Sequence, residues 1–140
     1  MALTKPSKTW LKYLNIKYEE LVNCDPVPFK RLSSSDIPNK PGVYLITARK
    51  YTREICYYVG RTKKLRNRHK QHLSSNFGSA RLQKYLVDTK ECSNPATAKE
   101  FIVKYCRVRW VEESNMRKRY ALEGYLTGML FPQHGISEEH

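Results

Sequence analysis

Apolar side chains recur at helical spacing near the start of the chain. Most are three or four residues apart, at Trp10, Leu14, Tyr18, Leu21 and Val22. This spacing predicts an amphipathic helix over residues 8–22. Such a helix usually covers a core, although an exposed Trp10 would also suit a dimer contact or a clamp on DNA. Four prolines between positions 26 and 41 then predict an irregular connection. We therefore divide the chain into an N-terminal helix with its connection, residues 1–35, and a main domain, residues 36–140.

The pattern then changes to strand-like runs. Residues 42–48 and 54–60 are rich in β-branched, aromatic and aliphatic side chains and flank a polar segment, residues 49–53. They predict a β-hairpin with a rather long loop. Residues 101–111 have the same character and predict a long strand.

Two helices are expected between the hairpin and that strand. Residues 63–73 are helical in composition, with Leu65 and Leu73 on one face. Residues 79–87 predict a second helix that Ser79 caps. The side chains expected to be buried in it are Leu82, Tyr85 and Leu86.

The last segments complete the pattern. Asn94 and Pro95 have the form of a helical first turn, with Asn as the cap and Pro in the first position. Ser114 is expected to cap a final helix that runs to about Leu130, and Pro132 ends it. The predicted order is helix, hairpin, two helices, strand and helix.

Charge indicates the partner. The 140 residues contain 26 Lys+Arg against 13 Asp+Glu, a formal net charge of +13 with a pI near 9.7. Phosphates attract clustered cations because counterions are released, so nucleic acid is the expected partner, although charge alone does not exclude a basic protein without that role. No apolar run is long enough to span a bilayer, and the N-terminus lacks the features of a signal peptide. We expect a cytoplasmic or nucleoid-associated protein with no membrane partner.

The four cysteines are widely spaced, at positions 24, 56, 92 and 106. They form no CxxC pair and have no histidine at zinc-finger spacing. Cys56 and Cys106 lie in strand-like runs, where a free thiol behaves as a small buried hydrophobe. We expect neither a zinc site nor a disulfide framework.

The hairpin carries two tyrosines that suit chemistry. Paired strands let Tyr44 and Tyr58 present phenols to one spot, and Gly60 is expected to let the chain turn tightly into the next helix. A phenol titrates near ~10 in water, so acting as a base requires cations that favour the phenolate. Tyrosines in strands are usually structural, so the functional reading depends on basic neighbours. The sequence supplies Arg61, Lys63, Lys64, Arg66, Arg68 and Lys70.

Arg68 and His72 are four residues apart and share one face of the predicted helix. An arginine there can bind a phosphate and stabilise the charge of a pentacovalent transition state. A histidine there can hydrogen-bond a tyrosine or move a proton. The remaining cations of this helix suggest contacts to backbone phosphates without catalysis; they are Lys63, Lys64, Arg66 and Lys70.

Glu123 is a third candidate, because its helical neighbours are largely apolar and a carboxylate in such surroundings needs a partner. Those neighbours are Met116, Tyr120, Thr127 and Leu130. Two partners remain open. Arg119, one turn earlier, would form a structural ion pair, whereas Mg²⁺ commonly binds one carboxylate together with substrate oxygens and water.

These features, in this order, resemble the GIY-YIG nuclease family. The first motif is Gly42-Val43-Tyr44, and residues 58–72, which begin with Tyr58-Val59-Gly60, closely match the second motif and the helix that follows it. The remaining elements are Arg68, His72 and Glu123. The resemblance covers roughly residues 40–135, and five ordered elements make chance agreement improbable. It implies an α+β fold with a small three-stranded antiparallel sheet flanked by helices, which agrees with the predicted element order.

The resemblance also implies roles for these residues. The family hydrolyses phosphodiester bonds with a divalent metal held by its glutamate, so Glu123 would bind Mg²⁺ or Mn²⁺. Arg68 would contact the scissile phosphate. Tyr44 would be the general base that activates water, helped by Tyr58 and His72, and the alternative in which Tyr58 takes the proton stays open. The metal would polarise the phosphate and stabilise the leaving oxygen.

Two features depart from the family's pattern. The family commonly has an asparagine just after a proline beyond the last helix, where this chain has Pro132, Gln133 and His134. Either His134 takes that place or the position is unused. The loop between the motifs is also somewhat longer than in the shortest members. Its cations Arg49, Lys50 and Arg53 favour phosphate contacts beside the cut over a merely solvated loop tip.

The leading prediction is a metal-dependent DNA endonuclease. A restriction-type enzyme would act on double-stranded DNA as a homodimer with twofold symmetry. Mobile-element, phage or repair nicking nucleases of the same family are alternatives. A non-catalytic nucleic-acid-binding module with this fold also stays open, as does an RNA substrate, although the sequence lacks the aromatic-rich surface strand typical of RNA readers.

Overall fold

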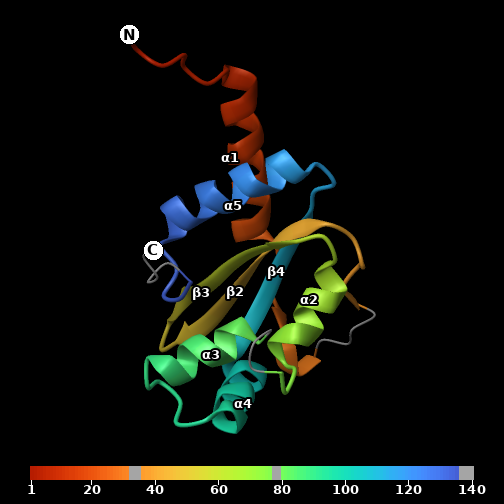
Figure 1. The fold of residues 1–140 in the computed structure, drawn as a ribbon, viewed down its shortest axis with the longest axis vertical. Coiled ribbons are helices and arrows are strands. Elements are labelled where there is room, and N and C mark those ends of the chain that lie inside the picture. Colours follow the sequence, from red (N-terminus) through yellow and green to blue (C-terminus); the bar gives the residue numbers. More distant parts are fainter. Residues whose placement is uncertain (32–35, 77–79, 136–140) are drawn as a thin grey trace.

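The structure is a computed structural model that describes residues 1–31, 36–76 and 80–135. In these ranges, four strands form one antiparallel sheet flanked by five helices (Figure 1). The strands are β1 (Val27–Pro28), β2 (Gly42–Lys50), β3 (Arg53–Thr62) and β4 (Cys106–Glu112), in the spatial order β1-β4-β2-β3. The helices are α1 (Lys8–Asn23), α2 (Leu65–His72), α3 (Arg81–Asp88), α4 (Pro95–Tyr105) and α5 (Met116–Leu130), and η1 (Phe29–Arg31) is a short 3₁₀ turn. The predicted α+β fold is confirmed, with the two-residue β1 as an additional edge strand.

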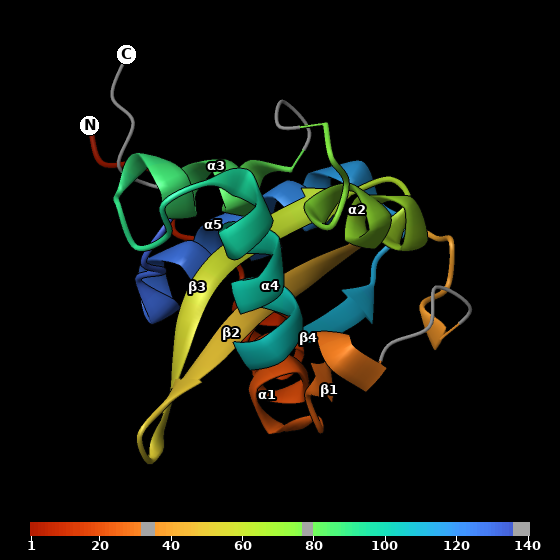
Figure 2. The ribbon, with the colours of Figure 1, turned by 90° about the horizontal axis from the view of Figure 1, so that it is seen from below.

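The sheet separates two apolar layers. Even-numbered residues of β2 such as Tyr44 and Ile46 pack with α2, α3 and α4, whereas Val43 and Leu45 pack with α1 and α5. Figure 2 shows α2 and α3 above the strands and α1 below them. Because both faces are covered, the first seven residues of β2 are all buried. The candidate residues on this strand are therefore fixed by the core itself.

The N-terminal helix forms where predicted, but Trp10 is not an exposed side chain. The Ser7 side chain caps α1 by accepting a hydrogen bond from the Trp10 amide at 3.1 Å. The Trp10 ring is partly buried and stacks on Tyr13 with the centroids 5.4 Å apart. Leu14 and Leu21 of α1 are buried in the apolar layer that contains Val43 and Leu45 of β2. The proposed domain boundary at residue 35 lies outside the described residues and stays a prediction.

The hairpin turn is shorter than predicted. β2 runs to Lys50 and β3 begins at Arg53, so only Tyr51 and Thr52 form the turn, with Tyr51 at φ 58°. Polar residues 49–53 predict a loop, but a polar sequence does not by itself end strand pairing. The last strand residues extend beyond the core, so they are exposed and polar although they remain paired, as Arg49 is with Glu54.

The long strand predicted over residues 101–111 is also wrong in its first half. Asn94 and Thr97 form a capping box at the start of α4, and the helix continues to Tyr105 before β4 begins. Ala98 and Ile102, four residues apart, are its buried positions. A short apolar run fits a buried helix as well as a strand, and here the capped helix determines the outcome.

Other predictions differ in detail. Asn115 rather than Ser114 caps α5, and its side chain accepts a hydrogen bond from the Lys118 amide. Ser79 lies outside the described residues, and α3 begins after Ala80. The side chains predicted to be buried in α3, Leu82, Tyr85 and Leu86, are buried.

Cys106 is buried in β4 and Cys56 is partly buried in β3, and burial raises the pKa of both thiols, to about 12 and about 11. Among the described residues, no helix combines the length and apolar character needed to cross a membrane.

Candidate active site

Two glycines let strand β2 approach its neighbours β3 and β4 closely. A Cβ on Gly60 would lie 2.4 Å from the Tyr44 hydroxyl oxygen, and one on Gly42 would lie 2.3 Å from the Val111 carbonyl oxygen. Gly60 pairs directly with Tyr44 inside β3. The expectation that Gly60 makes a tight turn is therefore wrong, because this position needs glycine to make room for the Tyr44 phenol.

A bulge in β3 places two consecutive tyrosines on one face. Ile46 pairs with Tyr58 and Thr47 with Cys56, so Tyr57 is the additional residue. Both Tyr57 and Tyr58 pack with the layer that contains Tyr44. The Tyr44 and Tyr58 rings stack with their centroids 6.1 Å apart. The prediction that the two phenols approach one spot is confirmed.

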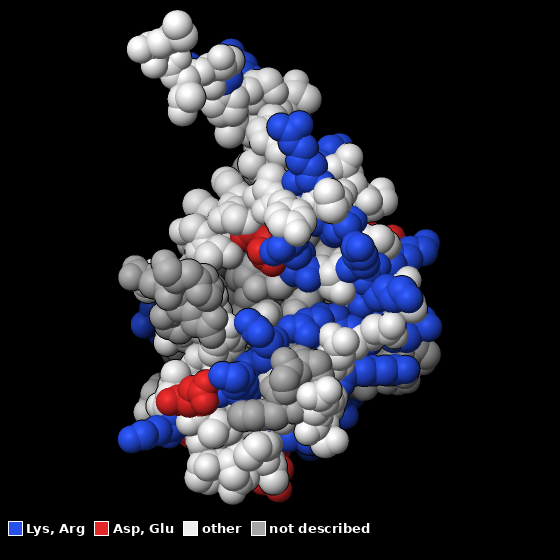
Figure 3. Space-filling model, in the orientation of Figure 1, with Lys and Arg blue, Asp and Glu red and all other residues white. Residues whose placement is uncertain are grey.

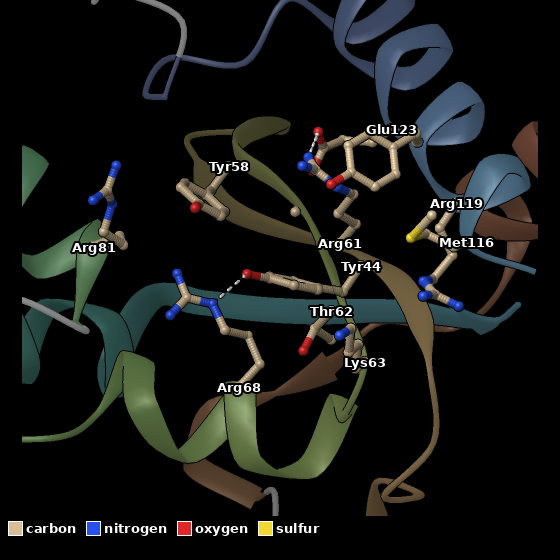
Figure 4. A pocket seen from close by; sticks show the side chains of 12 residues that line it. Tyr44, Tyr58, Arg61, Thr62, Lys63, Arg68, Arg81, Met116, Arg119 and Glu123 are labelled. Carbon is tan, nitrogen blue, oxygen red and sulfur yellow. Dashed lines mark hydrogen bonds and ion pairs between the residues drawn. The ribbon is translucent and has the colours of Figure 1, made fainter. Parts of the chain in front are cut away.

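The Tyr44 hydroxyl is the centre of a buried network. It accepts a hydrogen bond from Nε of Arg68 at 3.1 Å and forms a second hydrogen bond with Nε2 of His72 at 2.8 Å. Tyr44 and His72 are 4% and 1% exposed, so water does not compete for these bonds. Gln83, itself buried, holds the end of α2 by donating to the His72 carbonyl oxygen at 2.8 Å. Figure 4 shows Arg68 reaching from α2 to the phenol.

The network sets the protonation of both aromatic groups. Burial raises the pKa of Tyr44, helped by repulsion from Tyr58, and Arg68 offsets only part of this rise. Burial, together with the charge of Arg68 and neighbouring His69, holds the pKa of His72 well below its usual range. Burial alone would lower the pKa of Arg68, but its contacts with the Tyr44 and Tyr58 phenols outweigh burial and raise it. At neutral pH the pair is a neutral phenol beside a neutral imidazole, with a charged guanidinium next to them.

Glu123 faces this network from the other side of the cleft. Its Oε1 accepts a hydrogen bond from Nη1 of Arg61 at 2.5 Å, and the Arg61 guanidinium lies 3.6 Å from the centroid of Tyr120. The structural partner of Glu123 is thus Arg61 and not Arg119. Arg119 is buried and donates instead to the carbonyl oxygens of Glu113 and Ser114. Both carbonyls lie just before the start of α5, so these bonds tie the helix to the end of β4.

These groups line one cleft of about 530 Å³, which we call the active-site cleft. Of the predicted residues, the lining includes Tyr44, Tyr58, Arg61, Lys63, Arg68 and Glu123. Glu123 is the only carboxylate among its described lining residues. Lysine and arginine side chains gather across this face of the molecule (Figure 3). The cleft lies along residues 58–62 of β3, the outer strand of the sheet.

The donor set of the cleft fits a hard divalent cation. Arg61 uses Oε1 of Glu123, and no hydrogen bond or ion pair from a described residue reaches Oε2. The Glu123 side chain is 24% exposed, so it is accessible from solvent. A single carboxylate with oxygens from water and substrate is a usual Mg²⁺ arrangement. The described residues contain no cluster of three or more His, Cys, Asp or Glu that would form a closed metal site.

Other predicted residues lie away from the cleft. Lys64 and Lys70 are exposed on and beside α2, and Arg66 donates from Nε to the Ile37 carbonyl oxygen at 2.9 Å. Arg53 begins β3 at the tip of the hairpin. Arg49 lines a second opening of about 520 Å³, which we call the distal groove. Its other cations are Lys30, Arg31, Lys104 and Arg107, and it also contains Tyr51 and Tyr105.

Five further cleft residues were not candidates for function from the sequence. They are Thr62, Arg81, Met116, Arg119 and Tyr120. Tyr120 lies three residues before Glu123 on the same helical face, and this spacing could have identified it from the sequence. Arg81 enters the cleft from α3, which is far from the motifs in sequence, so no local pattern identifies it.

Similar known proteins were found by comparison of structures and not by comparison of sequences. No protein-family model matches the sequence, and no curated protein matches it. Among solved structures, the chain is similar to the GIY-YIG N-terminal endonuclease domain of UvrC from Thermotoga maritima bound to its catalytic divalent cation, magnesium. That match has a TM-score of 0.45 and 17% identity over 87% of this chain and 97% of the other. A tyrosine-to-phenylalanine variant of the same domain matches with a TM-score of 0.46 and 16% identity over 94% and 99%. At these scores the functional proposal rests on the residues of this chain.

Proposed function

We propose that the protein is a metal-dependent DNA endonuclease of the GIY-YIG type. The observation that carries the proposal is the Tyr44 hydroxyl held between Arg68 and His72, opposite Glu123 in a basic cleft. A purely structural tyrosine has no need of a cationic partner and a carboxylate facing it across an opening. The same arrangement meets the requirements of phosphodiester hydrolysis, which needs a base, a cation at the phosphate and a metal ligand.

Glu123 would hold the divalent cation, Mg²⁺ or Mn²⁺, which when bound polarises the phosphate and neutralises charge on the leaving oxygen. Arg61 is the residue that must adjust, because it already binds one oxygen of the carboxylate. Its contact with Tyr120 keeps the guanidinium beside the cleft, where it can bind a substrate phosphate.

Tyr44 and His72 together act as the base. As the Tyr44 oxygen takes a proton from the attacking water, its own proton passes to Nε2 of His72 along the 2.8 Å bond. This path avoids a free phenolate, which the raised pKa of Tyr44 disfavours. The lowered pKa of His72 keeps the imidazole neutral beforehand, and it also makes the protonated ring a strong acid that gives the proton up again readily. Tyr58 stacks beside Tyr44 and remains the alternative acceptor of the water proton.

Arg68 stabilises the transition state. Its Nε is committed to Tyr44 and its Nη1 to Gln71, so the guanidinium is oriented before substrate binds. A preorganised cation of this kind acts most strongly when the phosphate gains charge. The substrate is DNA, most simply double-stranded. Lys63, Lys64, Lys70 and the hairpin cations would contact the backbone on either side of the cut.

Plasmid cleavage in Mg²⁺ tests the proposal. We expect the wild type to cut and Glu123→Ala to lose the activity, whereas Glu100→Ala, which removes an exposed carboxylate from α4, should cut normally. Binding measured in EDTA should be nearly equal for all three. If the wild type binds DNA but never cuts it with Mg²⁺ or Mn²⁺, the protein is a binding module. Cleavage of RNA alone would reassign the substrate.

A more specific proposal than a DNA endonuclease is a restriction-type enzyme that cuts as a homodimer. Two active sites related by twofold symmetry cut both strands at a palindromic site. Supercoiled plasmid should then convert directly to linear DNA with a fixed set of ends, and sedimentation should show a dimer on the DNA. Accumulation of nicked circles by a monomer would favour a nicking nuclease of the repair, phage or mobile-element kind.

A further inference from the structure

A third opening joins the active-site cleft on the side of α3 and the C-terminal segment. We call this opening of about 430 Å³ the side slot. It shares Tyr58, Arg61, Arg81 and Glu123 with the cleft, so the two openings are continuous at the groups proposed for catalysis. The mechanism above uses only the cleft, and the side slot has no role in it.

One wall of the side slot is aromatic. Tyr85 of α3 stacks on His134 with a centroid distance of 6.1 Å and an interplanar angle of 15°, and it lies 6.3 Å from Tyr58. The wall is firmly held, because the His134 amide donates to the Tyr57 carbonyl oxygen and its Nε2 lies 3.1 Å from Oε1 of Glu91. His134 is only 3% exposed. The position where the family has an asparagine is thus built into this wall, away from the Tyr44 network.

The α5 residues that line the slot are Glu123, Gly124 and Thr127, and the middle one has no side chain. Gly124 of α5 lines the side slot, and a Cβ there would meet no atom within 4 Å. Core packing therefore does not require glycine at this position, although glycine inside a helix is destabilising relative to alanine. The missing side chain leaves the slot open.

We propose that the side slot holds the base of the nucleotide next to the scissile phosphate. The inference rests on the proposed nuclease function and adds a subsite to it. A volume of about 430 Å³ is in the range of small-ligand pockets, and a slot lined by both an aromatic pair and a glycine suits a flat ring. Arg81 stands where the slot meets the cleft, with its guanidinium 5.9 Å from the Tyr85 centroid, and provides a cation for the phosphate of that nucleotide.

Two glycines of α5 provide a matched test. Gly128 is also an exposed helical glycine with open space around it, but it is not among the residues lining the slot. We expect Gly124→Leu to lower kcat/KM for plasmid cleavage by about tenfold, since base–aromatic packing is worth about five- to 150-fold per base. Gly128→Leu should stay within about twofold of the wild type. Both variants should melt no lower than the wild type, because leucine favours the helix.

A probe without cleavage separates the side slot from the nuclease function. In EDTA, titration of ¹⁵N-labelled protein with deoxyadenosine 5′-monophosphate should shift the amides of Gly124, Tyr85 and Gly135. Deoxyribose 5-phosphate, which lacks the base, should bind at least about tenfold more weakly. Gly124→Leu should abolish this difference, and Gly128→Leu should keep it.

The outcomes distinguish the two proposals. If plasmid is cut but Gly124→Leu behaves like Gly128→Leu, the slot proposal is wrong and the nuclease stands. If plasmid is not cut but the nucleotide binds more tightly than the sugar phosphate in a Gly124-dependent way, the slot stands and the nuclease is wrong. Equal binding of the two probes overturns the slot whatever the plasmid shows.

Discussion

The active-site cleft and the distal groove are nearly equal in volume, about 530 and 520 Å³, and both are basic. They differ in what lies beside the cations. The cleft contains a carboxylate, Glu123, and reaches the buried Tyr44 network. The described lining of the distal groove contains five cations and two tyrosines, Tyr51 and Tyr105, which are 97% and 46% exposed, but no carboxylate.

This difference shows that positive charge and chemistry are separate requirements. Cations attract a polyanion wherever they cluster, because counterion release does not depend on geometry. Hydrolysis needs groups whose protonation is set in advance, and at Tyr44 and His72 burial is the largest cause of that. We therefore expect changes in the cleft to affect turnover and changes in the distal groove to affect affinity alone.

Removal of the Tyr44 hydroxyl should have the largest effect. Tyr44→Phe removes the proposed route from water to His72, and we expect single-turnover cleavage to fall by about 10²- to 10⁴-fold, the usual contribution of general base catalysis. The DNA Kd in EDTA should change by less than about threefold. A matched loss of binding would instead make Tyr44 a structural part of the DNA contact.

Tyr58→Phe is the matched control for this prediction. Because Tyr58 stacks beside Tyr44, this variant distinguishes the two possible bases. A larger loss of cleavage in Tyr58→Phe than in Tyr44→Phe would reverse the assignment.

A methyl group at position 60 should be nearly as harmful. In Gly60→Ala the new Cβ meets the Tyr44 phenol at 2.4 Å, so the ring must move away from Arg68 and His72. Misplacement of a reacting group by about 1 Å can cost about 10²-fold in rate. We expect that loss in single-turnover cleavage, with little change in affinity. Normal activity would show that the position of the phenol is not critical.

Acid should lower the stability of the fold through His69 of α2, which stacks on Phe29. Burial lowers the pKa of His69 from 6.5 to about 4 in the folded protein. As the pH falls below 6.5 the unfolded chain takes up a proton first, so stability is lost down to about pH 4. The contribution between pH 7 and pH 5 is about 2 kcal/mol.

Urea unfolding at pH 7 and pH 5 measures this effect. His69→Phe keeps the stacking and removes the titrating group, so its loss of stability on acidification should be smaller than that of the wild type by about that amount. His72, whose pKa is also lowered, keeps some pH dependence in both proteins. An unchanged difference between the two pH values in His69→Phe would contradict the assignment.

The smallest effects should come from the distal groove. Arg49 and Arg107 line it from neighbouring strands, and Arg49→Ala combined with Arg107→Ala should weaken DNA binding by about tenfold. The slope of log Kd against log salt should fall by about one for each phosphate that the variant no longer neutralises. Cleavage at saturating protein should be unchanged. A fall in the single-turnover rate would mean that the groove takes part in catalysis.

Much of the fold could be predicted from local pattern. The α1 helix, the paired strands β2 and β3 and the capped start of α4 all follow from periodicity, β-propensity or turn chemistry within a few residues. The errors came where local signals are ambiguous. An apolar run over residues 101–111 fits either helix or strand, and its division at Cys106 depends on packing against η1 and β2.

The candidate site residues could be identified from the sequence alone, because the two motifs, Arg68, His72 and Glu123 are identifiable by type and order. How these residues interact became clear from the folded chain. In the structure, Arg61 pairs with Glu123, and Gly60 leaves room for the Tyr44 phenol. His134 forms part of an aromatic wall. The physical reason is that hydrogen bonding, close approach and burial depend on distances between segments that are far apart in the chain. Those distances are set by the sheet and by the helices packed on it, and no local pattern contains them.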